Sequence, residues 1–155
     1  MSLEEAVREA LAGVVDPEIP TASINDLGMV ERVEVTPDGV EIDLLPTFLG
    51  CPAKVVIGEQ ARRAAEAVSG DRRVDVRFVL DPPWTTDRVN EAGRSALREY
   101  GISPESDRCP YCGSSDTELS SDFGPTPCRS THFCRGCRNV FEGFKLKVRA
   151  QGEGR

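Results

Sequence analysis

The sequence predicts an α+β protein. A small mixed sheet carries helices on one face, in the order α-β-β-α-β-α, and a zinc ribbon follows at the C-terminus. Three observations support this. Apolar residues recur with the period of a helix in three segments, and they alternate with the period of a strand in three others. Five of the six cysteines lie close together in the last third of the chain, in two C-x-x-C pairs and one extra position.

The first predicted element is a helix over residues 2–13. Ser2 and Glu5 have the spacing of a capping box, and Gly13 is a typical helix end. The apolar residues of this segment form one stripe: Leu3, Ala6, Val7, Ala10 and Leu11. Residues 16–28 follow, and their two prolines and the Asn-Asp-Leu-Gly turn formers predict a long irregular loop, a kind of segment that often carries function.

A hairpin and a helix come next. Val30, Val33 and Val35 lead into Thr36-Pro37-Asp38-Gly39, which is a strong turn signal. Apolar residues alternate on the return strand, at Val40, Ile42 and Leu44. Residues 46–52 predict a second loop. One apolar face then predicts a helix over about 53–68.

The remaining elements place a domain boundary. Alternation predicts a strand over 74–80, and a last helix covers about 87–100 before a polar linker. We therefore expect an α/β domain over residues 1–105, a zinc ribbon over 106–150 and a disordered tail over 151–155.

Charge and hydropathy narrow the class of protein. Residues 1–105 hold 20 acids and 11 bases, whereas residues 106–155 hold 6 acids and 8 bases, so the body is acidic and the tail is slightly basic. An acidic body disfavours binding to nucleic acid or to an anionic membrane surface. No apolar run reaches the length of a spanning helix, and the N-terminus lacks the pattern of an export signal. We expect a cytoplasmic protein with reduced thiols.

The strongest motif is the pair of C-x-x-C knuckles. Four thiolates in a tetrahedron form the usual structural zinc site, which leaves no position open for a substrate. A module of this size buries little core, so zinc would supply most of its stability. Cysteines without metal, and mononuclear iron, are the alternatives. The predicted ligands are Cys109, Cys112, Cys134 and Cys137.

Two further residues of the ribbon are Cys128 and His132, the only histidine of the chain. We interpret both as part of the ribbon's packing, with a spare ligand or a redox thiol as the alternative. Phenylalanines interleaved with bases in the same region could stack on single-stranded nucleic acid, but they more often form a small core and a solvated rim.

Cys51 is the candidate reactive group of the body. Pro52 after it suits the first position of a helix, which would place Cys51 at the cap, where the helix dipole favours a thiolate. The sequence supports equally well the alternative that Cys51 is a buried residue that caps the helix and has no reactive role. Asp16 and Glu18 could place carboxylates near Cys51, or they could act only as turn and cap residues.

Two motifs of the body resemble a known family. Asp16-Pro17-Glu18 followed by Asn25-Asp26-Leu27-Gly28, and Thr47 ahead of Cys51-Pro52, resemble the signature of a small α/β family linked to iron–sulfur cluster assembly. With CPYCGSSDTELSSDFGPTPC and CRGC added, the whole chain resembles the phenylacetate-degradation D family, the D subunits of phenylacetyl-CoA epoxidase systems.

The resemblance implies an accessory or maturation protein in aerobic phenylacetate breakdown. It would support insertion of iron or an iron–sulfur cluster, with the epoxidase subunits, above all the iron–sulfur reductase, and iron–sulfur assembly proteins as partners. Cys51 would be the functional thiol, with Asp16, Glu18 and Thr47 around it. Iron or a cluster would be held only transiently, in addition to the structural zinc of the ribbon.

The residues themselves set limits on the activity. The chain has neither the Glu-x-x-His pairs of a di-iron bundle nor a dinucleotide glycine loop, so we expect no oxygenase or reductase activity of its own. A thiol-dependent enzyme that uses Cys51, and a nucleic-acid-binding zinc ribbon, remain the alternatives. We expect no membrane partner.

Overall fold

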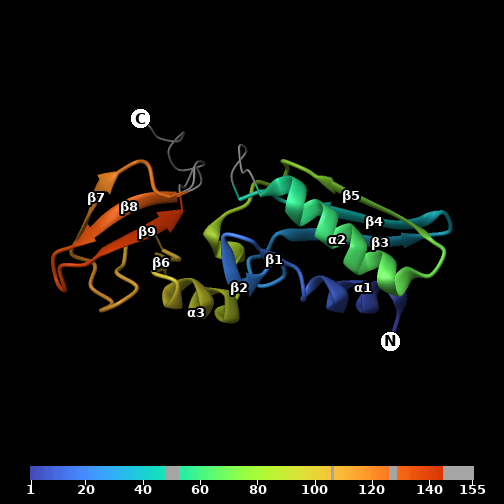
Figure 1. Cartoon of the computed structure of the whole chain (residues 1–155), viewed down its shortest axis with the longest axis horizontal. Coiled ribbons are helices and arrows are strands. Elements are labelled where there is room, and N and C mark those ends of the chain that lie inside the picture. The colour runs from blue at the N-terminus through green and yellow to red at the C-terminus, as the bar shows by residue number, and fades with distance from the viewer. Residues whose placement is uncertain (48–52, 106, 126–128, 145–155) are drawn as a thin grey trace. The chain divides into compact units, whose positions relative to one another are not determined.

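The computed structural model describes residues 1–47, 53–105, 107–125 and 129–144. The chain divides into two compact units. The first holds the described residues up to Pro46 and from Ala53 to Trp84, and the second holds Thr47 and the residues from Thr85 onwards. Figure 1 shows the elements of each unit.

The first unit is built on a three-stranded sheet in the order β3-β4-β5. β3 (Val30–Thr36) pairs antiparallel with β4 (Gly39–Leu44), and β4 pairs in parallel with β5 (Arg73–Phe78). The sheet is therefore mixed, as the sequence predicted. Gly39 is essential to the parallel pair, because a Cβ atom there would stand 2.3 Å from the carbonyl oxygen of Arg73.

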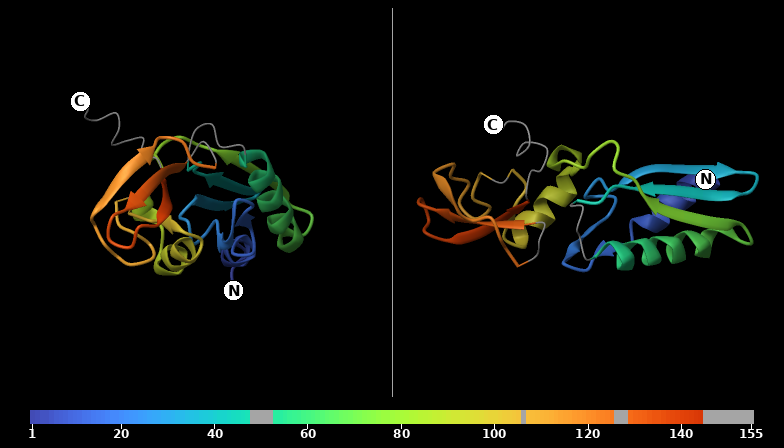
Figure 2. Two further views of the ribbon diagram at one scale, coloured as in Figure 1. Left: turned by 60° about the vertical axis from the view of Figure 1, so that its left-hand side comes forward. Right: turned by 90° about the horizontal axis from the view of Figure 1, so that it is seen from above.

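Two helices supply the core of this unit. α1 (Leu3–Leu11) begins with the predicted capping box between Ser2 and Glu5. α1 packs against α2 (Lys54–Ser69) and β3, and α2 also packs against β5 (Figure 2). The large side chains that become fully buried include Leu11, Ile42, Leu44 and Ile57.

The opposite face of the sheet carries ion pairs. Asp43 lies at its centre and is only 7% exposed. Its two carboxylate oxygens accept hydrogen bonds from Nε of Arg32 at 2.9 Å and Nε of Arg77 at 2.7 Å. The hydrogen bond from Arg77, followed by that from Arg32, holds the pKa of Asp43 below its ordinary value despite partial burial.

Residues 16–28 are more ordered than predicted. β1 (Val15–Asp16) pairs antiparallel with β2 (Ile19–Ser23), and the turns that follow bury Ile24, Leu27 and Met29. Trp84 encloses this segment by donating its indole N–H to the carbonyl of Leu27 at 2.6 Å. The prediction of an irregular loop was wrong because these apolar side chains pack into the core, which single-residue turn preferences do not report.

The second unit contains η1 (Thr86–Arg88), α3 (Glu91–Glu99) and a four-stranded sheet in the order β6-β9-β8-β7. β7 (Thr117–Ser121), β8 (Arg129–Cys134) and β9 (Val140–Phe144) are antiparallel neighbours, and they form the predicted ribbon. β6 (Ile102–Ser103) pairs in parallel with β9.

The last helix thus groups with the ribbon, not with the α/β body. We expected the boundary near residue 105, but β6 follows α3 directly and its backbone joins the ribbon sheet. Whether residues 1–105 and 106–150 fold separately stays a prediction. None of the helices in the described ranges is long and apolar enough to cross a membrane.

Candidate metal centre

The first knuckle is a tight turn over Cys109–Gly113. The amide of Gly113 donates to the carbonyl of Cys109 at 3.0 Å, and the amide of Cys109 donates to the carbonyl of Ser114 at 2.9 Å. Gly113 has a φ of +81°, a conformation that glycine adopts without strain. The glycine after the second cysteine therefore lets the chain turn back and aim both thiols to one side.

The second knuckle connects β8 to β9 in the same way. The amide of Arg138 donates to the carbonyl of Cys134 at 2.8 Å, and Arg138 takes a φ of +65° at the position that matches Gly113. Gly136 lies close to the first knuckle, because a Cβ atom there would meet the side chain of Ser114 at 3.2 Å. The glycine in C-R-G-C thus allows the two knuckles to approach each other.

The four predicted ligands come together at one point. Sγ of Cys109 lies 3.6 Å from Sγ of Cys137, and Sγ of Cys112 lies 3.6 Å from Sγ of Cys134. All four sulfur atoms lie within 4.8 Å of one another. A tetrahedron with metal–sulfur bonds of about 2.3 Å has sulfur–sulfur edges of roughly 3.8 Å, so this arrangement fits one tetrahedral ion.

Hydrogen bonds to sulfur orient the ligands. The amide of Tyr111 lies 3.3 Å from Sγ of Cys109, and the amide of Cys137 lies 3.4 Å from Sγ of Cys134. The side-chain amide of Asn139 donates to Sγ of Cys137 at 3.3 Å. Such donors stabilise thiolate charge and fix the direction of the lone pairs. Asn139 was not among the predicted site residues, although its place two residues after the last cysteine is a signal for such a contact.

The thiols differ in acidity. The Asn139 side chain, above all, lowers the pKa of Cys137 to about 7. At Cys112 a backbone hydrogen bond from Ser114 lowers the pKa of the thiol. The neighbouring sulfur atoms, above all that of Cys134, act in the opposite direction and raise this pKa to about 11. Four thiolates this close repel one another, so the cluster ionises fully only with a cation at its centre. The cluster is a metal-binding site by its chemistry.

His132 does not join this cluster. His132 stacks on Phe141, with ring centres 5.2 Å apart, and its Nε2 lies 2.8 Å from Oγ of Ser130. Burial lowers the pKa of His132. Phe141 itself packs with Cys109 and Cys134, two of the four clustered cysteines. His132 thus has the packing role that we preferred, whereas Cys128 lies outside the described residues.

The predicted site of the body is described only in part. Asp16 is buried, and its carboxylate accepts a hydrogen bond from the amide of Glu18 at 2.9 Å, so it stabilises its own turn. Thr47 is also buried, in the second unit. Cys51 lies outside the described residues, but the cap of α2 is Ala53, so the prediction that Cys51 caps this helix was wrong.

Comparison with known proteins decides the family. Two family models match parts of the chain: an iron–sulfur cluster assembly protein over residues 4–77 and a PaaD zinc β-ribbon domain over residues 95–145. The putative D subunit of the 1,2-phenylacetyl-CoA epoxidase of Escherichia coli is 43% identical over 147 residues, which cover 87% of this chain and 88% of the relative. The chain belongs to the PaaD family.

Other relatives of this PaaD family member match about 60% of its length. The Fe–S protein maturation auxiliary factor YitW of Bacillus subtilis is 33% identical and covers 61% of this chain and 97% of its own length. A crystal structure of a domain of unknown function, DUF59, from Bacillus anthracis has a TM-score of 0.56 at 25% identity, covering 61% of this chain and 91% of that one. These matches and the clustered cysteines confirm the α+β class with a C-terminal zinc ribbon.

Proposed function

We propose that this chain is an accessory factor of iron–sulfur protein maturation that acts in the cytoplasm on the phenylacetyl-CoA epoxidase system. Its cargo is iron or an iron–sulfur cluster, and the recipient is the epoxidase's iron–sulfur reductase. The observation that carries the proposal is that one chain contains both an iron–sulfur assembly domain and a four-thiolate ribbon. The match to the E. coli relative spans both parts and covers 88% of that protein.

The metal in the ribbon is zinc and its role is structural. Four sulfur atoms within 4.8 Å of one another leave no coordination position for a substrate. A closed site of this kind stabilises a small module and does not deliver its ion. The cargo would therefore bind elsewhere, and we propose Cys51 as the thiol that holds it, with Asp16, Glu18 and Thr47 as the supporting residues of the family signature.

Two experiments test this function. In cells that lack the protein, the epoxidase and its reductase should accumulate, but the purified reductase should be deficient in iron and acid-labile sulfide. Fully loaded epoxidase and reductase should turn over phenylacetyl-CoA in vitro without this chain.

A different result would assign a different role. If turnover by the fully loaded enzymes depends on stoichiometric amounts of this chain, the protein is a catalytic or structural subunit and the maturation role is wrong. If the reductase from the deletion cells carries a full complement of iron and sulfide, cluster delivery to that subunit is wrong.

A further inference from the structure

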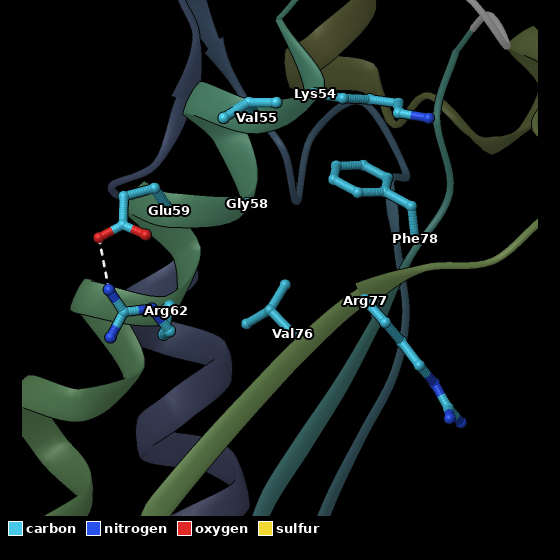
Figure 3. A pocket seen from close by; sticks show the side chains of 8 residues that line it. All are labelled: Lys54, Val55, Gly58, Glu59, Arg62, Val76, Arg77 and Phe78. Carbon is cyan, nitrogen blue, oxygen red and sulfur yellow. Dashed lines mark hydrogen bonds and ion pairs between the residues drawn. The ribbon is translucent and has the colours of Figure 1, made fainter.

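A groove lies between the first half of α2 and strand β5, within the first unit (Figure 3). Its volume is about 290 Å³. Residues of both elements line it: from the helix Lys54, Val55, Gly58, Glu59 and Arg62, and from the strand Val76, Arg77 and Phe78. Pockets for drug-sized ligands span roughly 300–1,000 Å³, so this groove has the size for one or two side chains of a protein partner, not for a cofactor.

Apolar side chains line part of the groove. Val55 is 81% exposed, and it shares the groove with Val76 and Phe78, which are partly buried. Gly58 brings the helix close to the strand, because a Cβ atom there would stand 3.4 Å from the ring of Phe78. A single exposed valine is ordinary, but an exposed valine that lines a groove together with two partly buried apolar side chains can be covered by a partner.

The strand that borders the groove is at the edge of its sheet. In the described part of the chain, β5 pairs with β4 alone. The amide of Val79, just after β5, donates inwards to the carbonyl of Leu44 at 2.8 Å. Hydrogen-bonding groups alternate in direction along a strand, so the N–H and C=O groups of Val76 and Phe78 point outwards. Such an edge can pair with one more strand.

The charge at the groove is positive. Nζ of Lys54 lies 5.7 Å from the ring centre of Phe78, and within the described ranges Lys54 forms no ion pair. The other cations that line the groove already form ion pairs within the protein. Arg62 pairs with Glu59, and Arg77 leads away from the groove to Asp43 (Figure 3). Lys54 is therefore available to a carboxylate of the partner.

We infer that this groove binds an extended, acidic segment of a partner protein, which adds to β5 as a further strand. Its backbone would pair with Val76 and Phe78, one apolar side chain would pack against Val55, and an acidic side chain would reach Lys54. Backbone pairing supplies affinity in this mode, and alternate side chains supply specificity. The inference does not depend on which complex the chain serves.

Like charges disfavour two other occupants of the groove. Residues 145–155 of this chain carry four bases and one acid, so they would bring positive charge to Lys54. A second copy that paired through its own β5 would bring Arg73 and Arg77, with Asp75 as its one acid. Both arrangements place like charges together, which disfavours pairing.

The test uses two labelled six-residue peptides and the full-length zinc-loaded protein. One peptide alternates glutamate with valine, and the other alternates lysine with valine. We expect the glutamate peptide to bind at least tenfold more tightly, measured by fluorescence anisotropy. In NMR spectra of the protein, it should shift the amide signals of Val76 and Phe78. Equal affinities, or binding that leaves the β5 amides unchanged, would overturn the inference.

Variants separate the three parts of the site. Lys54→Glu should lower affinity for the glutamate peptide at least tenfold and reverse the preference between the peptides. Val55→Glu should also weaken binding, whereas Val68→Glu, a partly exposed valine of the same helix outside the groove, should not. Val76→Pro should remove the outward N–H while leaving the pairing with β4 intact. Each variant is used only if its melting temperature shows a folded protein.

The competing occupants give distinct results. If deletion of residues 145–155 makes the β5 amides exchange faster with solvent, the chain's own tail fills the groove and the inference is wrong. If the protein forms a dimer that Lys54→Glu strengthens, the occupant is a second copy and the inference is equally wrong.

Discussion

The phenolic oxygen of Tyr111 lies only 2.5 Å from the point where a Cβ atom on Gly101 would stand. Gly101 has a φ of +81° and connects α3 to β6, whereas Tyr111 belongs to the first knuckle. The first metal-binding turn therefore packs against the connection ahead of the ribbon sheet, and any larger residue at position 101 would displace the Tyr111 side chain.

Gly101→Ala should destabilise the second unit more than Gly113→Ala does. Both glycines have a φ of +81°, but a Cβ atom on Gly113 would meet nothing within 4 Å. The shared backbone strain costs about 1–2 kcal/mol, and displacement of Tyr111 adds roughly 1 kcal/mol. Amide hydrogen exchange of β8 and β9 measures the difference. With Tyr111→Phe as the background the two substitutions should cost the same, and a difference that persists would show that the contact is irrelevant.

The purified protein should contain one zinc ion per chain. Cys109→Ser or Cys137→Ser should abolish metal binding and remove the amide protection of β7, β8 and β9, while the sheet β3-β4-β5 stays protected. Cys128→Ser is the matched control and should retain the metal. Elemental analysis and hydrogen exchange make the measurements, and freshly isolated protein with neither zinc nor iron would contradict this prediction.

Asn139→Ala should shift zinc binding to higher pH. The amide of Asn139 is the leading cause of the lowered pKa of Cys137, about 7 against an ordinary value of 9.0, so its removal should raise that pKa. Metal competes with protons for the thiols, so the variant should need a higher pH than the parent for the same zinc affinity. Competition with a chelator at a series of pH values measures the affinity, and curves that coincide for the two proteins would show that the hydrogen bond to Sγ does not act.

Asp43→Asn should destabilise the first unit by about 1–2 kcal/mol, a value reduced for solvent screening because the Arg77 side chain is 65% exposed. Asp75→Asn is the control: its pair with Arg73 is exposed on both sides and should contribute under about 0.5 kcal/mol. The pKa of Asp43 is lowered in the folded state. Its stabilisation is therefore present above the ordinary value of 3.8 and is lost as the pH falls below it. Denaturation of both variants at pH 7 and pH 3 checks this, and equal effects at the two pH values would contradict it.

Cys51→Ser and Cys51→Ala should impair growth on phenylacetate and leave the melting temperature within a few degrees of the parent. A working thiol acts through its sulfur atom and not through packing, so its replacement should cost under about 1 kcal/mol of stability. The level of protein in the cells serves as the control for stability. Full growth with Cys51→Ala would exclude this residue as the working thiol.

The sequence by itself determined the features that depend on neighbours along the chain. The capping box of Ser2 and Glu5, the turn that ends at Gly39 and the two C-x-x-C knuckles are all local. In each, a few residues at short spacing satisfy backbone groups or a metal, so the pattern alone predicts the geometry.

Only the tertiary structure decided the pairings between distant segments. It made β5 the parallel neighbour of β4, and it buried Asp43 between two arginines from other strands. It also paired β6 with β9, two strands that are separated in sequence by both knuckles. It also made residues 15–16 and 19–23 a pair of strands that contribute to the core. These contacts depend on the packing of side chains far apart in sequence, and the local preference of a residue carries no information about which distant partner will satisfy it.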